Sequence, residues 1–328
     1  MNKTIGFVKS DKLFEKRLAI LPEDIMKITH KDSIFIEEGY GKDFGIEDEC
    51  YNKAGVHVES RKQVLTCDIV CDPKIGEAKY LKDLKEHTQL FGWIHAVEDP
   101  KLTSLLVDKK FVCYAWEELT HNGRHLFWEN NFIAGESAVL HALQCLGILA
   151  YGKQVAIIGR GNTAMGANYI IQSLGGKVKF FNRQMEHELR DEIGDFDIVI
   201  NAVLWDPSRV DHILYHKDLQ HMKPQAMLID VSDDADGAIE GARSTTIKDP
   251  LYEMDGVMVY AVNNTPSLYY RSATSTISPL IADYVDALIT SKEEILKECK
   301  IISCGVIHDE KITTYQTSMQ QKNKAIIH

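Results

Sequence analysis

Three side chains in the N-terminal half of the chain could bind and activate an α-keto acid: Arg17, Lys74 and His95. Arg17 lies in the segment after the apolar run "TIGFVK", Lys74 follows "CDIVCD" and Pro73, and His95 ends the run "LFGWIH". The carboxyl ends of parallel strands share one edge of a sheet, where ligands bind, so we expect these groups to converge. A guanidinium or ammonium group grips a carboxylate, and Lys or His can polarise a carbonyl or an imine and exchange a proton with it.

The segment "VAIIGRGNTAMG" has the spacing of a dinucleotide-binding turn, with Gly159, Gly161 and Ala164 in the form G-x-G-x-x-A. The first glycine allows the tight turn, the second lets the backbone approach a pyrophosphate, and the small third residue lets the helix lie close to the strand. Asn162 and Thr163 would begin that helix, whose N-terminal N–H groups face the phosphates. A strand before the turn and a helix after it are the context that the motif requires.

The second strand of this unit ends in "FFNRQ", which places Asn182 and Arg183 where an NAD enzyme usually has a carboxylate. A carboxylate would repel a 2′-phosphate, whereas Arg183 could pair with it through a charged, forked contact. We therefore expect NADP(H) as the cofactor. Arg160, inside the glycine turn, either adds a second positive group or is a solvated loop arginine.

Each of the three N-terminal residues also has an ordinary structural interpretation. Arg17 could be a surface charge, Lys74 a turn residue, and His95 a strand-end histidine that is hydrogen-bonded to backbone. Taken together, and beside a unit that carries a hydride donor, they favour an active site over three unrelated structural residues.

The elements that must position these groups alternate between strand-like and helix-like runs, as in parallel sheets that are covered on both faces. We expect two doubly wound, Rossmann-like α/β domains in this chain of 328 residues. Residues 1–130 and 271–328 would form the substrate (catalytic) domain and residues 131–270 the dinucleotide-binding domain. The last long helix, within "TISPLIADYVDALITSKEEILKEC", would return to the first domain.

Composition narrows the class of protein. An apolar fraction of 45% and a charged fraction of 26% are ordinary for a globular protein. The formal net charge of -11 argues against nucleic-acid or anionic-membrane partners. The chain shows no signal peptide or membrane span, and its seven scattered cysteines indicate reduced thiols, so we expect a cytoplasmic protein.

The sequence resembles the alanine dehydrogenase and pyridine-nucleotide transhydrogenase family through nearly its whole length. The matching pieces are "EKRLAILPED", "VCDPKIGE", "LFGWIHAVEDPKLTSLLVDKK", "IAGESAV", the glycine turn, "MKPQAMLIDVS" and "STTIKDPLYEMDGVMVYAVNNTPS". The resemblance implies that Arg17 binds the substrate carboxylate and that Lys74 and His95 contact the keto acid, one of them as acid/base. It also implies a catalytic role for Asp234, a place beside the nicotinamide for Asn264, and a homo-oligomer, as a dimer or tetramer.

Several segments depart from the alanine dehydrogenase pattern, namely "DDADGAIE", "NNTPSLYYR", "FFNRQ" and the tail "CGVIHDEKITTYQ". They are similar instead to an opine-type branch of the family, which uses NADPH. That branch condenses pyruvate with the side-chain amine of ornithine (or lysine) and reduces the imine to N5-(carboxyethyl)ornithine. Three alternatives remain: an alanine dehydrogenase that uses ammonia, a saccharopine dehydrogenase-like enzyme that uses 2-oxoglutarate, and a non-catalytic dinucleotide sensor.

Two further groups of residues could bind ligands. Asp233, Asp234 and Asp236 could hold the positive groups of a diamino acid, or could form a solvated loop. His212 and His216 stand four residues apart, a spacing that can hold a metal on a helix. No third ligand is evident, so we expect no metal site.

Overall fold

The computed structural model describes residues 2–206, 209, 211–234 and 237–326, so Asp236 lies outside the described residues. The chain divides into two compact units. Unit 1 comprises residues 1–127 and 270–328, and unit 2 comprises residues 128–269. The expected α/β class with two large, mostly parallel sheets is confirmed. No helix among the described residues is long and apolar enough to cross a membrane.

Unit 1 is built on an eight-stranded sheet in the order β16-β15-β6-β5-β4-β1-β2-β3. The strands are β1 (Ile5–Phe7), β2 (Ile34–Glu37), β3 (His57–Glu59), β4 (Ile69–Cys71), β5 (Gln89–Gly92), β6 (Val112–Ala115), β15 (Lys300–Ser303) and β16 (Val306–Ile307). The run from β6 to β3 is parallel, whereas β15 and β16 are antiparallel additions at the edge. The strand order changes direction between β1 and β4, the place where parallel sheets bind ligands.

Helices and two apolar cores cover the faces of this sheet. The helices are α1 (Pro22–Ile25), α2 (Asp48–Ala54), α3 (Arg61–Val64), α4 (Pro100–Asp108), α9 (Tyr270–Ile289), α10 (Glu293–Leu296) and α11 (Glu310–Ile326). Neighbouring residues of β5 enter opposite cores, Leu90 on one face and Phe91 on the other, as the two-residue period of a strand requires.

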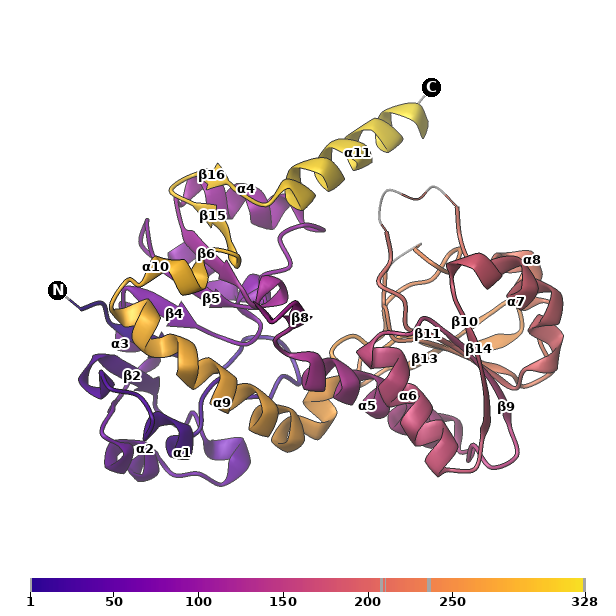
Figure 1. Ribbon diagram of the computed structural model, residues 1–328, viewed down its shortest axis with the longest axis horizontal. Coiled ribbons are helices and arrows are strands. Elements are labelled where there is room, and N and C mark those ends of the chain that lie inside the picture. Colours follow the sequence, from indigo (N-terminus) through magenta and orange to yellow (C-terminus); the bar gives the residue numbers. More distant parts are fainter. Residues whose placement is uncertain (1, 207–208, 210, 235–236, 327–328) are drawn as a thin grey trace. The chain divides into compact units, whose positions relative to one another are not determined.

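The helix expected within "TISPLIADYVDALITSKEEILKEC" returns to the first unit as α9, which confirms that expectation. Its residues Ile277, Ile281 and Val285 repeat every four positions and lie in the same core as Phe7 of β1. Figure 1 shows α9 running along the sheet of this unit. The side chains of Thr274 and Ser278 accept hydrogen bonds from the backbone N–H groups of Leu18 and Leu21 at 2.9 and 2.8 Å. The helix therefore fixes the segment that follows Arg17.

Unit 2 contains a six-stranded sheet in the order β10-β9-β11-β12-β14-β13, parallel except for β13. Its strands are β9 (Gln154–Ile158), β10 (Lys177–Phe181), β11 (Ile198–Asn201), β12 (Met227–Asp230), β13 (Leu251–Met254) and β14 (Val257–Tyr260). Its helices are α5 (Trp128–Leu146), α6 (Asn162–Ser173), α7 (Glu186–Glu192) and α8 (His216–Leu219). The strand order changes direction between β9 and β11, and the glycine turn directly follows β9.

Two glycines let α5 and α6 pack backbone to backbone (Figure 1). A Cβ on Gly135 would lie 1.9 Å from the carbonyl oxygen of Thr163, and a Cβ on Gly166 would lie 2.0 Å from that of Phe132. Both distances exclude any side chain. This contact holds the first turn of α6 in place behind the glycine turn.

Candidate active site

Arg17 lies between β1 and α1 and is 4% exposed. Its guanidinium forms a forked ion pair with Glu15, with Nε 2.9 Å from Oε1 and a terminal nitrogen 2.6 Å from Oε2. The guanidinium also lies over the Trp93 ring, 4.7 Å from its centroid. A buried, doubly supported guanidinium has a fixed orientation, which a surface arginine would lack.

Lys74 stands at the end of β4, in a loop shaped by Asp72. The Asp72 carboxylate accepts hydrogen bonds from the backbone N–H of Lys74 at 2.8 Å and from the hydroxyl of Tyr80 at 2.9 Å. The Lys74 ammonium lies 3.6 Å from the carboxylate of Glu77, and its side chain is 11% exposed. Complete burial raises the pKa of Asp72 to about 7, against the opposing effect of these hydrogen bonds.

The loop that carries Lys74 packs directly against the loop that carries His95. A Cβ on Gly76 would lie 1.9 Å from the carbonyl oxygen of Ile94, so only glycine fits there. The backbone N–H of Trp93 donates to the carbonyl of Pro73 at 3.3 Å, and that of Gly76 donates to the carbonyl of Trp93 at 3.1 Å. The "DPKIG" stretch therefore positions Lys74 relative to the end of β5.

His95 stands three residues beyond the end of β5, because the strand ends at Gly92, before the end of the apolar run "LFGWIH". Its φ of 54° lies in the left-handed region, which few residues other than glycine adopt. The side chain of Glu117 accepts hydrogen bonds from the backbone N–H of His95 at 2.6 Å and of Ile94 at 3.1 Å. A carboxylate at the end of the neighbouring strand thus fixes the unusual backbone of His95.

The electrostatics of unit 1 bring Arg17, Lys74 and His95 into one group. Burial, followed by repulsion from Lys12 and Arg17, lowers the pKa of Lys74 to about 8. Loss of solvation, followed by repulsion from Lys74, Lys12 and Arg17, lowers the pKa of His95 well below its usual range, although part of the residue is open to solvent. At neutral pH the imidazole is therefore neutral and Lys74 mostly protonated.

Lys12 belongs to this group and was not singled out in the sequence. Its ammonium lies 2.6 Å from the carboxylate of Glu77, the same carboxylate that Lys74 approaches. The sequence offered one indication of this role, namely that Lys12 lies five residues before Arg17. The segment between them has no helix or strand, so the direction of the Lys12 side chain could not be predicted.

The glycine turn of unit 2 has the geometry that a pyrophosphate needs. Gly159 has a φ of 109°, and a Cβ on it would lie 2.7 Å from the carbonyl oxygen of Ala202. A Cβ on Gly161 would meet nothing within 4 Å, so space is open at the start of α6. Ala164 is completely buried in the core beneath the turn, and Asn162 and Thr163 form the first turn of α6. These features fit a dinucleotide.

The end of β10 and the two residues after it, Phe181 to Arg183, include one arginine and no acidic residue. Asn182 caps the following turn, since its side chain accepts a hydrogen bond from the backbone N–H of Gln184 at 2.8 Å. Arg183 and, in the glycine turn, Arg160 are exposed to solvent. The guanidinium of Arg183 can donate two parallel hydrogen bonds to an anionic group on the adenosine ribose of a dinucleotide.

Asp234 and Asn264 lie in loops after β12 and β14. Asn264 has a φ of 69°, and its carbonyl accepts from the backbone N–H of Ser267 at 3.1 Å. Asp234 lies four residues after the buried Asp230, whose carboxylate accepts a hydrogen bond from the side-chain amide of Asn201 at 2.8 Å. Burial raises the pKa of Asp230 to about 7. We did not single out Asp230 from the sequence, because it is the last residue of an otherwise apolar strand.

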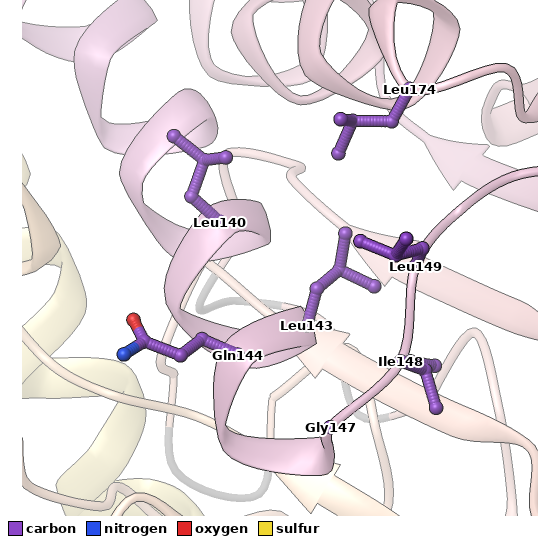
Figure 2. Close-up of a pocket in the computed structure, with 7 residues that line it drawn as sticks. All are labelled: Leu140, Leu143, Gln144, Gly147, Ile148, Leu149 and Leu174. Atoms are coloured by element: carbon purple, nitrogen blue, oxygen red, sulfur yellow. The ribbon is translucent and has the colours of Figure 1, made fainter.

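Unit 2 also contains a pocket of about 410 Å³, which is mostly apolar and so differs from the glycine turn (Figure 2). Its lining residues are Leu140, Leu143, Gln144, Gly147, Ile148, Leu149 and Leu174. They come from the C-terminal end of α5, the three residues that follow it and the residue after α6, whereas the glycine turn precedes α6. The lining offers one amide and no charge for a phosphate or a carboxylate.

The two histidines spaced like metal ligands are not on one helix. The helix α8 begins at His216, and the Nδ1 of His212 lies 2.7 Å from the carbonyl oxygen of Gly237. Among the described residues, no three His, Cys, Asp or Glu side chains gather closely enough to hold a metal ion.

Comparison with known families gives two matches that cover most of the chain. The model described as "Alanine dehydrogenase/PNT, N-terminal domain" matches residues 6–127, and "Alanine dehydrogenase/PNT, C-terminal domain" matches residues 149–315.

Among similar proteins, an N(5)-(carboxyethyl)ornithine synthase of Clostridium botulinum is 32% identical over 303 residues, which is 86% of this chain and 93% of that protein. One from Lactococcus lactis subsp. lactis is 31% identical over 297 residues, 86% of this chain and 95% of that protein. Alanine dehydrogenase 1 of Staphylococcus aureus is 24% identical over 344 residues, with 92% of each chain covered.

Solved structures share the fold at lower identity. An L-alanine dehydrogenase superimposes with a TM-score of 0.82 at 20% identity, covering 96% of this chain and 99% of its own. A transhydrogenase from Sinorhizobium meliloti gives a TM-score of 0.76 at 18% identity, with coverages of 93% and 99%.

Proposed function

The chain belongs to the alanine dehydrogenase/PNT family, and on this basis we propose that it catalyses the NADPH-dependent condensation of pyruvate with the side-chain amine of ornithine or lysine. Family membership makes it an oxidoreductase that acts on CH–NH bonds with a nicotinamide dinucleotide. The proposed reaction joins pyruvate, the amine, NADPH and a proton into the N-carboxyethyl amino acid, NADP⁺ and water.

The observation that carries this proposal is the cluster of Arg17, Lys74 and His95 at the strand ends of unit 1, with Lys12 beside it. The three cations of this cluster, Arg17, Lys74 and Lys12, suit a substrate with a carboxylate and a polarisable carbonyl. The choice of amine follows the higher identity to the two carboxyethylornithine synthases than to the alanine dehydrogenase.

The protonation states assign roles to the side chains. Arg17, held by Glu15, binds the carboxylate of pyruvate, and the ammonium of Lys74 donates a hydrogen bond to the carbonyl oxygen. The neutral His95 accepts a proton from the attacking amine and returns it when water leaves the carbinolamine. The carbonyl oxygen takes up two protons before it leaves as water, and Lys74, with a pKa of about 8, can donate the one that His95 does not return.

The cofactor would be held by Gly159, Gly161 and the first turn of α6, with Arg183, Arg160 and Asn182 around the 2′-phosphate. Asn264 would lie beside the nicotinamide, and Asp234 would orient the ribose or a catalytic group. When bound, NADPH supplies the hydride that reduces the imine carbon.

The proposal is tested by following NADPH oxidation with pyruvate and, separately, ornithine, lysine or ammonia. Oxidation with ornithine or lysine at concentrations where ammonia is inactive supports it. If ammonia alone supports oxidation, the enzyme is an alanine dehydrogenase, the rival that the relative in Staphylococcus aureus favours. A further arm with 2-oxoglutarate in place of pyruvate detects a saccharopine dehydrogenase-like preference.

A further inference from the structure

The backbone of His95 is held by one half-buried carboxylate, that of Glu117. Glu117 lies in the 3₁₀ turn Trp116–Glu118, which directly follows β6, and β6 is the parallel neighbour of β5. One of its carboxylate oxygens accepts from the N–H of His95 at 2.6 Å and the other from the N–H of Ile94 at 3.1 Å. One side chain thus accepts from two successive backbone donors, the second of which belongs to His95 itself.

This contact holds a conformation that the local sequence does not favour. His95 has a φ of 54°, where a side chain crowds its own backbone. Such conformations persist where surrounding contacts over-determine them. On the other side, the carbonyl of Ile94 is pressed against Gly76, the residue two positions after Lys74. The end of β5 is therefore fixed between the Lys74 loop and Glu117.

We propose that Glu117 is a positioning residue of the keto-acid site: it holds the backbone of His95 so that the imidazole points to the substrate that Lys74 binds. The proposal rests on the proposed function for its activity readout. Glu117 holds the backbone of Ile94 and His95 and is assigned no contact with a reacting atom, so its effect on turnover passes through the position of His95.

The test is the variant Glu117→Gln, alone and combined with His95→Ala. The amide retains one acceptor oxygen but turns an NH₂ group towards the second backbone N–H, so one of the two hydrogen bonds is lost. We expect kcat to fall by about 30-fold or more, a part of the contribution of a general acid or base, while NADPH affinity is unchanged. In the His95→Ala background, Glu117→Gln should lower kcat less than about twofold further.

The adjacent glutamate provides a matched control. Glu118 lies in the same turn but pairs with Lys311, at 2.6 Å. Glu118→Gln should leave kcat at the wild-type value. Glu117→Asp keeps the charge but is one methylene shorter, so it should lower kcat less than Glu117→Gln does, and this variant serves if the glutamine variant does not fold.

A readout without substrate separates this proposal from the proposed reaction. The imidazole signal of His95 in a proton–carbon NMR spectrum, assigned by its loss in His95→Ala, should shift in Glu117→Gln and stay in place in Glu118→Gln. Wild-type turnover in Glu117→Gln, an unmoved His95 signal, or effects that multiply in full in the double variant would each overturn the proposal. If none of the tested substrates supports NADPH oxidation, the proposed reaction fails, and the NMR signal of His95 still decides whether Glu117 positions that residue.

Discussion

Two nitrogens of the Arg17 guanidinium donate hydrogen bonds to the two oxygens of the Glu15 carboxylate. Both side chains are almost completely buried, with 2% of Arg17 and 0% of Glu15 exposed to solvent. Such a pair fixes the orientation of the arginine side chain. It also creates a dependence, because removing either partner leaves an uncompensated buried charge.

Glu15→Gln should therefore destabilise unit 1 by about 3 kcal/mol, the usual result of breaking a buried ion pair. The free energy of unfolding in urea measures this effect. Glu49→Gln is the control, since Glu49 forms an exposed pair with Lys53 at 3.9 Å and should show no measurable change. Equal stability of the two variants would mean that the Glu15–Arg17 pair does not hold the loop.

His95→Ala should lower kcat by about 100-fold or more, because it removes the neutral base proposed for the amine. NADPH affinity should be unchanged, since the glycine turn belongs to the other unit. Steady-state kinetics and nucleotide titration measure the two effects. His121→Ala, at an exposed histidine of the strand Thr120–His121, should match the wild type. Near-normal turnover in His95→Ala would return His95 to a structural role.

The lowered pKa of Lys74, about 8, predicts how binding depends on pH. The ammonium form is present below that pKa, so affinity for a keto-acid analogue such as oxamate should fall as pH rises through about 8. Calorimetric titration at several pH values measures this fall. Because Lys12 is the largest charge effect that lowers this pKa, Lys12→Met should move the midpoint to higher pH.

Lys12→Arg keeps the positive charge and should leave the midpoint of that titration where it is in the wild type. If oxamate affinity stays constant to pH 10 in the wild type, the ammonium of Lys74 does not bind the ligand.

Arg183→Gln should weaken NADPH binding by about 10-fold or more, the loss expected for a forked arginine–phosphate contact. NADH binding should change little, because NADH has no 2′-phosphate. The ratio of dissociation constants for the two nucleotides is the measurement. Lys177→Gln, at the exposed first residue of β10, is the matched control. A variant that keeps the wild-type ratio would remove the basis for an NADP preference.

The sheet cores were predictable because apolar runs of parallel strands are nearly continuous. The runs "QVAIIGRG" and "AMLIDVS" indicated β9 and β12 directly. The short edge strands β3 (His57–Glu59) and β13 (Leu251–Met254) were not predicted, since their side chains are mostly exposed or half-buried and give no apolar signal. The helix α11 was also missed, because few of its residues are apolar.

The sequence could predict which residues of the candidate site follow the ends of strands, but not the contacts that these residues make. Arg17, Lys74 and His95 could be placed at one edge because parallel strands share their carboxyl ends. Glu15 and Glu117 could not be recognised in advance, because their roles depend on contacts with residues in loops. The left-handed backbone of His95 likewise follows from Gly76 and Glu117, which are 19 and 22 residues away in the sequence.

The central claim is most directly tested by the mass of the product formed from pyruvate and ornithine with NADPH deuterated at the transferred position. The account predicts a single new compound, N-carboxyethyl ornithine, carrying one deuterium on the carbon that was the carbonyl of pyruvate. Parallel reactions replace ornithine with lysine or with ammonia. Deuterated alanine from the ammonia reaction, together with no adduct of ornithine or lysine, would contradict the account.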